Sequence, residues 1–405
     1  MVIGIIGAGA SGMVAALAAA VNPDVKVLLF ERQARVGRKL LATGNGRCNI
    51  TNLHASGSSY HGDTPEFAHS ALCAVNVEQT LTWFRSLGLY TVAEESGRVY
   101  PYSDQANSVV DVLRFALQKS NIELITGFEV NAVRRNESRF VVCGADASYP
   151  CDKVIVACGG LAGTKLGGSM AGYKLLRSLG HHCTKLRPTL VQIKSNWGSC
   201  TSLKGVRANC SAAIYCDDTL HSQSKGELQF TEYGLSGPVI FEISRDVCQK
   251  KGDWVCRLDF LPDMDTNSLK QELLRRRDSQ LPTEEILTGI LHNRLGKVLV
   301  AAAGIRGQRT MDSLKENEID ALCCVVKGLE VCLTEPLGMD AAQVTAGGIV
   351  TAEFDPMTME SRLVRGLYAC GEVLDIDGDC GGYNLQWAWS SGITAGRCAG
   401  EVTNY

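Results

Sequence analysis

The first part of the chain alternates between apolar runs and a glycine-rich turn. Apolar residues at 2–6 predict a buried strand, the alanine-rich stretch 13–21 predicts a helix, and the apolar run 25–30 predicts a second strand. A glycine turn at 7–12 separates the first strand from the helix. Strand, helix and strand in this order predict a βαβ unit, in which the two strands are parallel.

Helical and strand periodicities continue to alternate as far as about residue 187. Apolar residues recur at helical spacing in 77–87 and 108–120, and a short helical turn is expected at 36–41. The rest of the segment 32–52 is rich in glycine, asparagine and arginine, which predicts a loop. Short strands are expected at 97–102, 122–126, 128–134, 140–143 and 154–157.

A different pattern begins at about Pro188. Alternating apolar and polar residues predict a β-rich, barrel-like part over 188–262, and helical spacing predicts a helical part over 263–330. Ser236 and Pro238 are typical of a helix start, as the N-cap and a first-turn residue. Strands are expected at 191–194, 208–216, 227–230 and 254–260, and further helices at 267–277, 283–294 and 311–327.

The α/β pattern returns at about residue 338, with a short strand at 367–369 and a helix at 384–394. A chain of 405 residues is long enough for two or three lobes. The simplest organisation is one nucleotide-binding domain formed by residues 1–187 and 338–405. It is interrupted by an inserted domain at 188–337.

Composition narrows the class of protein. Hydrophobic residues make up 45% of the chain and charged residues 20%, which is ordinary for a globular protein. The net charge of -3 favours neither nucleic acid nor an anionic membrane as a partner. Glycines interrupt the apolar N-terminus and no basic region precedes it, so we expect a cytoplasmic protein without a secretory signal. The seventeen cysteines show no Cys-x-x-Cys spacing, which predicts reduced thiols and no metal site.

The turn at residues 7–12 has the Gly-x-Gly-x-x-Gly pattern of dinucleotide-binding proteins, in the strand-turn-helix context that the pattern requires. Gly7 would permit the tight turn. Gly9 would let a pyrophosphate approach the backbone, and Gly12 would let the helix pack close to the strand.

The helix start and the end of the second strand complete this site. The helix begins near Ala10 and Ser11, whose free N–H groups and positive dipole end would face the phosphates. Glu31 follows the second strand, nineteen residues after Gly12. It is placed to accept hydrogen bonds from the two ribose hydroxyls.

Two later segments favour FAD over a nicotinamide cofactor. Residues 153–159 and 366–372 each consist of an apolar strand that ends in a glycine turn. Flavoproteins place such turns beside the cofactor, the second one near the ribityl and pyrophosphate region. The contacts expected from these segments are Ala157, Gly159, Gly371 and Glu372.

A helix beginning at Asn384 is expected to direct its N-terminus at the flavin N1–O2 edge, with Gly382 in the preceding turn. Reduced flavin carries negative charge at this edge. The helix dipole and the N–H groups of Leu385 and Gln386 would stabilise that charge. The order and spacing of the three motifs therefore predict FAD rather than NAD.

The segments 37–52, 226–238 and 381–388 resemble the bacterial YhiN-type flavoproteins, whose members include proteins described as an aminoacetone oxidase and as the bile-acid reductase BaiN. The likeness spans essentially the whole chain, and residues 159–181 also resemble the fumarate-reductase class. It implies an α/β protein with a Rossmann-like FAD-binding domain of the glutathione-reductase or fumarate-reductase type. It further implies noncovalent FAD and a bacterial enzyme. Glu232 stands where many relatives carry histidine.

The segment after Glu31 supplies further expected contacts. Arg38 and Lys39 would meet phosphate or ribityl oxygens. The glycine-rich turn at 43–46 would pass along the isoalloxazine, because glycines allow a close backbone approach. Val130, in an expected strand, would meet the adenine edge through its backbone. The full set of these contacts is Arg32, Arg38, Lys39, Thr43, Gly44, Asn45, Gly46 and Val130.

Three residues are candidates for chemistry beside the flavin. Arg47 would hold a carboxylate or polarise a carbonyl, because a guanidinium group binds planar oxygens in a bidentate manner. Tyr383 would donate a proton or form a stacking wall, and Asn45 would hydrogen-bond the N3, O4 or N5 region. No histidine lies inside a flavin motif, so none is named as a catalytic base.

These features predict an FAD-dependent oxidoreductase with hydride transfer at flavin N5. We expect reduction of a conjugated C=C bond in a hydrophobic ketone, with NADH or NADPH as a transient reductant. The alternative is an amine or aminoketone oxidase that uses oxygen, and a further one is an RNA-modifying flavoprotein or a non-catalytic flavin sensor. The expected partner is a small molecule, without nucleic acid or membrane, and the expected state is a monomer or homodimer.

Overall fold

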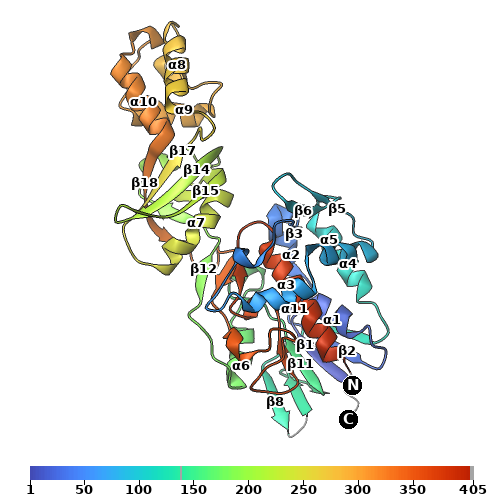
Figure 1. Ribbon diagram of the computed structural model, residues 1–405. Helices are drawn as coiled ribbons and strands as arrows, with labels where there is room; N and C mark the ends of the chain where they lie inside the picture. Colours follow the sequence, from blue (N-terminus) through green and yellow to red (C-terminus); the bar gives the residue numbers. More distant parts are fainter. Residues whose placement is uncertain (137–138, 402–405) are drawn as a thin grey trace. The chain divides into compact units, whose positions relative to one another are not determined.

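The computed structural model describes residues 1–136 and 139–401 (Figure 1). The chain divides into two compact units. Unit 1 comprises Met1–Arg187 and Gln343–Tyr405, and unit 2 comprises Pro188–Ala342. Each unit has its own hydrophobic core. Two stretches that are distant in sequence therefore fold together in unit 1.

A five-stranded sheet forms the centre of unit 1, and every pair of neighbouring strands in it is parallel. Its central strand, β1 (Val2–Ile6), is buried on both faces, with Ile3 and Ile5 on one face and Gly4 and Ile6 on the other, as expected for a parallel sheet that is covered on both sides. All strands end at the same edge, so the turns that follow them meet there. In spatial order the strands are β20 (Leu367–Ala369), β11 (Lys153–Val156), β1 (Val2–Ile6), β2 (Lys26–Glu31) and β7 (Ile122–Thr126).

Helices α1 (Ala10–Ala19) and α11 (Tyr383–Gly400) lie against each other in unit 1 (Figure 1). A Cβ atom added at Gly392 would lie 2.5 Å from the Ser11 carbonyl oxygen, and one at Gly396 would lie 2.3 Å from that of Ala15. The two backbones can approach this closely because small residues face each other. The contact joins the end of the chain to the first βαβ unit.

Smaller elements surround the central sheet of unit 1. The antiparallel sheets consist of β8 (Ala132–Asn136), β9 (Arg139–Cys143) and β10 (Ser148–Cys151), of β3 (Thr51–Asn52), β6 (Arg98–Pro101) and β5 (Thr91–Ala93), and of β4 (Tyr60–His61) with β21 (Asp377–Gly378). Strand β19 (Val344–Ala346) also belongs to unit 1, and β12 (Arg187–Thr189) runs across the boundary between the two units. The remaining helices are α2 (Arg38–Ala42), α3 (Phe67–Ala74), α4 (Val77–Ser86), α5 (Ala106–Ala116) and α6 (Ala171–Ser178).

Unit 2 contains a closed six-stranded barrel. Along one of its long strands Cys210, Ala212 and Ile214 are fully buried, while the residues between them are partly exposed. This alternation fills the barrel with apolar side chains. In spatial order the strands are β13 (Ile193–Ser195), β16 (Gly234–Ser236), β15 (Thr219–Phe230), β14 (Arg207–Cys216), β17 (Trp254–Asp259) and β18 (Leu329–Pro336), and α7 (Pro238–Gln249) packs against β15.

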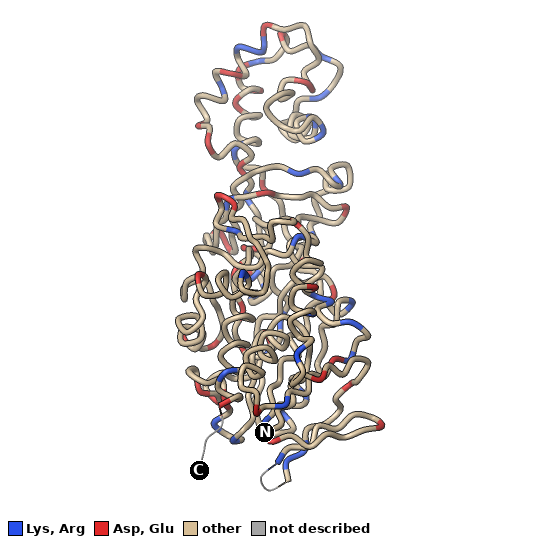
Figure 2. The backbone as a smooth tube through the Cα atoms, turned by 90° about the vertical axis from the view of Figure 1, so that its right-hand side faces the viewer, with Lys and Arg blue, Asp and Glu red and all other residues tan. Residues whose placement is uncertain are grey.

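Unit 2 also contains the helices α8 (Thr266–Arg277), α9 (Asn293–Ala302) and α10 (Glu316–Gly328). On the first of them Arg275 and Arg276 both pair with Glu272, at 2.8 and 2.7 Å, so one carboxylate offsets part of the positive charge of the arginine run. Figure 2 shows basic and acidic residues interspersed along the chain.

Two of the expected elements are wrong. The segment 283–294 forms only a 3-10 turn, Thr283–Glu285, and α9 begins at Asn293. The reason lies in the backbone, since Gly289 has a φ of 82° and the His292 side chain caps the later helix. The expected strand at 128–134 begins only at Ala132.

The part of the chain that the structure describes lacks features of two other classes of protein. None of its helices is both long and apolar enough to cross a bilayer. Among the same residues, His, Cys, Asp and Glu side chains nowhere gather in a group of three or more that could hold a metal ion. The seventeen cysteines are free thiols. Burial raises the pKa of Cys48 and of Cys158 to about 12, which keeps these two thiols protonated.

Candidate functional site

The three glycines of the first turn have the spatial roles that their spacing predicts. Gly7 has a φ of 104°, and a Cβ there would lie 2.5 Å from the Ala157 carbonyl oxygen. A Cβ at Gly12 would lie only 1.8 Å from the Gly7 oxygen. At Gly9, in contrast, an added Cβ would have no atom within 4 Å. The open side of the turn is therefore at Gly9, directly before α1.

Glu31 ends β2 beside this turn. Its carboxylate accepts hydrogen bonds from the N–H groups of Ala8 at 2.9 Å and Gln33 at 2.8 Å. A carboxylate has about four acceptor positions, so two remain for ribose hydroxyls. The N–H of Phe128 donates to the Glu31 carbonyl oxygen, and Val130 follows in the loop before β8. Val130 thus lies in a loop and not in the strand that we expected.

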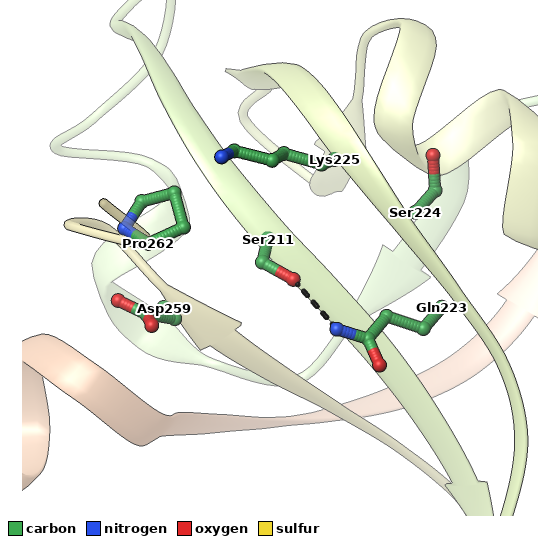
Figure 3. Close-up of a pocket in the computed structure, with 6 residues that line it drawn as sticks. All are labelled: Ser211, Gln223, Ser224, Lys225, Asp259 and Pro262. Carbon is green, nitrogen blue, oxygen red and sulfur yellow. Dashed lines mark hydrogen bonds between the residues drawn. The ribbon is translucent and has the colours of Figure 1, made fainter.

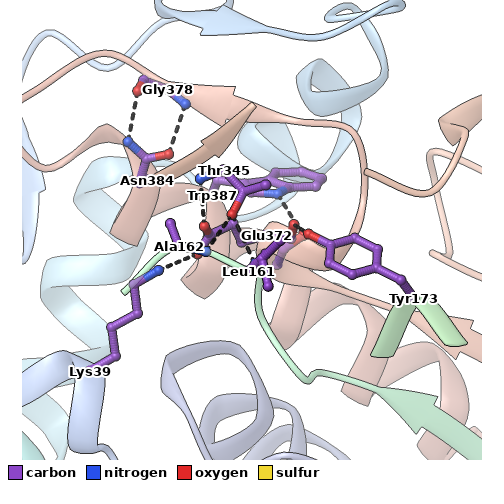
Figure 4. Close-up of polar contacts among 10 residues, drawn as sticks. Lys39, Leu161, Ala162, Tyr173, Thr345, Glu372, Gly378, Asn384 and Trp387 are labelled. Atoms are coloured by element: carbon purple, nitrogen blue, oxygen red, sulfur yellow. Dashed lines mark hydrogen bonds and ion pairs between the residues drawn. The ribbon is translucent and has the colours of Figure 1, made fainter. Parts of the chain in front are cut away.

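Lys39 and Glu372 pair with each other across 333 positions of sequence. Their side chains meet at 2.9 Å, and Glu372 also accepts the N–H of Thr345 at 2.8 Å (Figure 4). The Thr345 hydroxyl oxygen accepts the N–H groups of Leu161 and Ala162, each at 2.9 Å. This network ties together α2, β19 and the turns after β11 and β20. Both charged side chains, expected as cofactor contacts, thus have partners within the protein.

The turn before α11 is built from glycines and is held by side chains of the helix. Gly382 has a φ of 105°, and a Cβ there would lie 2.5 Å from the Thr51 carbonyl oxygen. The Asn384 side chain accepts the Gly378 N–H at 2.8 Å and donates to its carbonyl oxygen at 2.7 Å (Figure 4). Trp387 donates from its indole to the Gly371 carbonyl oxygen at 3.1 Å. The Asn384 side chain therefore positions the start of the helix.

The role expected for the N–H of Gln386 is wrong. This N–H donates to the Gly382 carbonyl oxygen at 3.0 Å, as a helical hydrogen bond, and the side chain is fully buried. The first turn of a helix leaves its N–H groups without intrahelical partners. Of the two expected donors, the N–H of Leu385 lies in this first turn of α11 and that of Gln386 does not.

The glycine-rich turn after α2 is exposed, and the arginine that follows it is engaged. Gly44 and Asn45 both have a φ of 57°, and the Thr43 hydroxyl donates to the Leu40 carbonyl oxygen. Arg47 forms ion pairs with Asp104 and Glu94, and its guanidinium lies 3.9 Å from the centre of the Tyr100 ring. The guanidinium of Arg47, which we expected to hold a carboxylate or polarise a carbonyl, is thus already paired with two carboxylates of the protein. The guanidinium of Arg32 donates to the Gly167 carbonyl oxygen at 2.6 Å, and that of Arg38 to the Gln33 side chain at 3.2 Å.

Sequence reasoning missed two features near the start of α11. The Oδ1 atom of Asn49 is buried without a hydrogen-bond partner and would lie 2.9 Å from a Cβ at Gly382. His61 Nε2 lies 2.7 Å from Asp379 Oδ1, where β4 pairs with β21. The Asn-rich run at 45–52 was a signal for the first feature. Nothing in the sequence signals the second, because its members are 318 positions apart.

Unit 2 contains a pocket of about 400 Å³ on its barrel (Figure 3). Gln223 donates to Ser211 at 3.1 Å, and Lys225 pairs with Asp263 at 2.6 Å. Gln223 and Lys225 thus have partners within unit 2. The residues expected to bind the cofactor all lie in unit 1.

The residues at this edge of unit 1 fit an adenine dinucleotide that carries a flavin. Gly9, Gly46 and Gly159 are each open on the side where a Cβ would lie. Two helix N-termini offer N–H donors of the kind that a pyrophosphate and a flavin edge would require. Glu31 and the unpartnered oxygen of Asn49 provide acceptors. Fold and site together define a Rossmann-type dinucleotide-binding protein.

Comparison with known proteins identifies the family. Residues 1–398 match the family model described as HI0933-like protein Rossmann domain. The chain is 40% identical to a Clostridium scindens protein named 3-dehydro-bile acid delta(4,6)-reductase, over 98% of this chain and 99% of the relative. It is 32% identical to the Escherichia coli ribosomal RNA dihydrouridine synthase, over 98% of this chain and 97% of the relative. The chain therefore belongs to the HI0933-like family, which confirms the resemblance to YhiN-type proteins, and it is a flavin oxidoreductase.

Solved structures with a similar fold are more distant. One is an open conformation of a flavocytochrome c3 fumarate reductase, with 15% identity, a TM-score of 0.48, and coverage of 98% of this chain and 78% of that chain. Another is the 3-ketosteroid delta1-dehydrogenase of Sterolibacterium denitrificans, with 13% identity, a TM-score of 0.48, and coverage of 98% and 99%.

Proposed function

We propose that this chain binds FAD noncovalently in unit 1 and reduces a C=C bond conjugated to a carbonyl group, with NADH or NADPH as the electron donor. One observation carries the proposal: the 40% identity to a reductase over nearly the full length of both chains. The name of that relative specifies a 3-oxo group with double bonds at positions 4 and 6, which is a conjugated dienone.

The other relatives support the same class of reaction on a different substrate. The two ribosomal RNA dihydrouridine synthases are 32% and 30% identical to this chain over almost its whole length. In uridine, a C=C bond of the ring is conjugated to a carbonyl group. In dihydrouridine this bond has been reduced to a single bond. Both named reactions can therefore proceed by hydride addition to a C=C bond that a carbonyl group polarises.

We favour a hydrophobic ketone over RNA as the substrate. The identity to the bile-acid reductase is higher, and the net charge of -3 does not attract a polyanion. Arg275 and Arg276 in unit 2 share Glu272, which offsets part of their positive charge. A uridine in RNA is the second candidate, favoured by the two full-length relatives.

Each part of the unit 1 edge has a role in this proposal. Bound FAD supplies hydride transfer at its N5 atom. The N-terminus of α1 beside Gly9 would hold the pyrophosphate, and Glu31 the ribose. The N–H of Leu385 would stabilise negative charge at the N1–O2 edge. Tyr383, half-buried at the first position of α11, is our candidate for proton donation to the substrate, and Arg47 would fix the 43–46 turn.

The test is anaerobic stopped-flow spectroscopy of the purified yellow protein. NADH or NADPH should bleach the flavin band, and a 3-oxo-4,6-diene bile acid should restore it, with one of its two C=C bonds reduced for each reduced flavin that is reoxidised. Restoration by ribosomal RNA and not by the dienone would favour the second candidate. Bleaching by an amine with peroxide formation in air would contradict the reductase proposal, and a colourless protein that takes up no FAD would contradict both.

A further inference from the structure

The side chain of Asn49 is a buried hydrogen-bond acceptor without a partner. The residue is 8% exposed, and its Oδ1 atom has no hydrogen-bond partner among the described residues. Buried polar atoms are nearly always hydrogen-bonded, so an unsatisfied one in a native protein calls for a partner from outside the chain. Oδ1 can only accept, so that partner must carry an N–H or O–H group.

The position of Asn49 indicates which ligand would supply the donor. Its Oδ1 would lie 2.9 Å from a Cβ at Gly382, the residue directly before α11. Its backbone nitrogen would lie 2.9 Å from a Cβ at Gly44. Asn49 therefore lies between the two glycine turns that, in the proposed function, flank the flavin ring.

The segment around Asn49 is firmly held. The N–H of Ile50 donates to the Val99 carbonyl oxygen at 2.8 Å, and Trp389 donates to the Ile50 carbonyl oxygen at 2.9 Å. The next hydroxyl, that of Thr51, donates to the Gln386 side chain at 2.6 Å. Such a fixed acceptor suits recognition, because little ordering is needed on binding. Asn45, which we first expected to contact the ring, is exposed and has no comparable support.

We propose that Asn49 recognises the pyrimidine edge of the flavin by accepting a hydrogen bond from its N3–H group. This inference rests on the proposed FAD site. The edge presents acceptors at N1 and O2 and, directly beside them, the N3–H donor. The start of α11 offers donors, and Asn49 offers an acceptor next to them. The donors and acceptor of the protein thus match the acceptors and donor of the ring edge.

The test compares FAD with 3-methyl-FAD, which lacks the N3 proton, in titrations of the apoprotein followed by flavin fluorescence. The wild-type protein should bind 3-methyl-FAD about tenfold more weakly, the usual effect of one lost hydrogen bond. Asn49→Ala should bind FAD about tenfold more weakly and bind the two compounds within about twofold of each other. The matched control Asn45→Ala should keep the wild-type ratio.

Other outcomes overturn the inference. If Asn49→Ala weakens both compounds by the same factor, Oδ1 binds another donor, such as a ribityl hydroxyl. If the wild type does not distinguish the compounds, no N3–H contact exists, and this result does not depend on whether any variant folds. A wild-type protein that binds neither compound would refute the proposed function itself. In Asn49→Asp, which keeps an acceptor in place, the preference for FAD should persist.

Discussion

Glu31 holds the glycine turn to the end of β2 through the N–H of Ala8, so the ribose site is formed before a ligand binds. We expect Glu31→Ala to weaken FAD binding by about 1.5–3 kcal/mol, or roughly 10- to 150-fold, because charge-assisted hydrogen bonds are lost. Fluorescence titration of the apoprotein measures the effect. The control is Glu123→Ala, since Glu123 is half-exposed on β7 and pairs with Lys26. Equal affinities for all three proteins would show that Glu31 does not bind the cofactor.

His181 gives unit 1 a predictable pH dependence. Its side chain is fully buried between Glu353, at 2.8 Å, and Ser361, at 3.0 Å. Burial lowers its pKa from 6.5 because the imidazolium is poorly solvated. Between the two pKa values the unfolded chain binds more protons than the folded one. The free energy of unfolding should therefore fall as the pH decreases below about 6.5, by at most about 1.4 kcal/mol per pH unit for this group.

Urea unfolding at several pH values tests this prediction. His181→Gln should be less stable at neutral pH but should lose less additional stability on acidification than the wild type. His54→Gln, at an exposed position, should show the wild-type pH dependence. An unchanged dependence in His181→Gln would assign the acid sensitivity to other groups.

Individual residues also show where sequence reasoning stops. The glycine spacing and Glu31 were readable because their roles depend on neighbours within one βαβ unit. Lys39 and Glu372 were taken as cofactor contacts because each stands in a suitable motif. Their mutual ion pair connects residues 333 positions apart, and no local pattern records it. Arg47 is a similar case, since its partners Glu94 and Asp104 come from a later segment.

At the scale of elements, the close contact of α1 and α11 depends on glycines spaced four residues apart. A Cβ at Gly396 would meet the Ala15 carbonyl oxygen at 2.3 Å, and backbone cannot easily move away. Gly396→Ala should therefore lower the free energy of unfolding by about 1–3 kcal/mol, the usual range for overpacking. Ordinarily a Gly→Ala change inside a helix stabilises by about 0.5–1 kcal/mol, so the expected sign is reversed.

Thermal unfolding followed by circular dichroism distinguishes the two signs. Gly328→Ala is the matched control, because Gly328 also lies in a helix and its added Cβ would meet only the Arg257 side chain at 3.8 Å. The Gly328→Ala substitution should not lower the melting temperature. A neutral or stabilising Gly396→Ala would mean that the two helices are farther apart than described.

Elements with a strong local signal were predictable, and those set by tertiary contacts were not. The strand at residues 122–126 coincides with β7, and the first βαβ unit was readable from its apolar runs. The spacing of residues 283–294 favoured a helix, but Gly289 adopts a positive φ and the helix begins only at Asn293. The strand expected from Phe128 begins later because the N–H of Phe128 donates to the carbonyl oxygen of Glu31, the last residue of β2.

At the scale of the whole molecule, unit 1 contains every residue proposed to bind the cofactor, and unit 2 has a separate core around its closed barrel. This predicts that the cofactor site does not need unit 2. A variant in which a flexible Gly/Ser linker replaces residues 188–342 should fold, remain yellow and bind FAD with an affinity within about tenfold of the full chain, since no proposed contact is removed.

The isolated segment 188–342 is the complementary half of this experiment. It should unfold cooperatively, because its buried residues pack against one another, and it should bind no FAD. If the shortened unit 1 is folded by circular dichroism but colourless, part of the cofactor site must come from unit 2. Loss of substrate reduction with retained FAD binding would instead show that unit 2 acts on the substrate. These two results separate the binding of the cofactor from the choice of substrate, which the unit 1 residues alone do not explain.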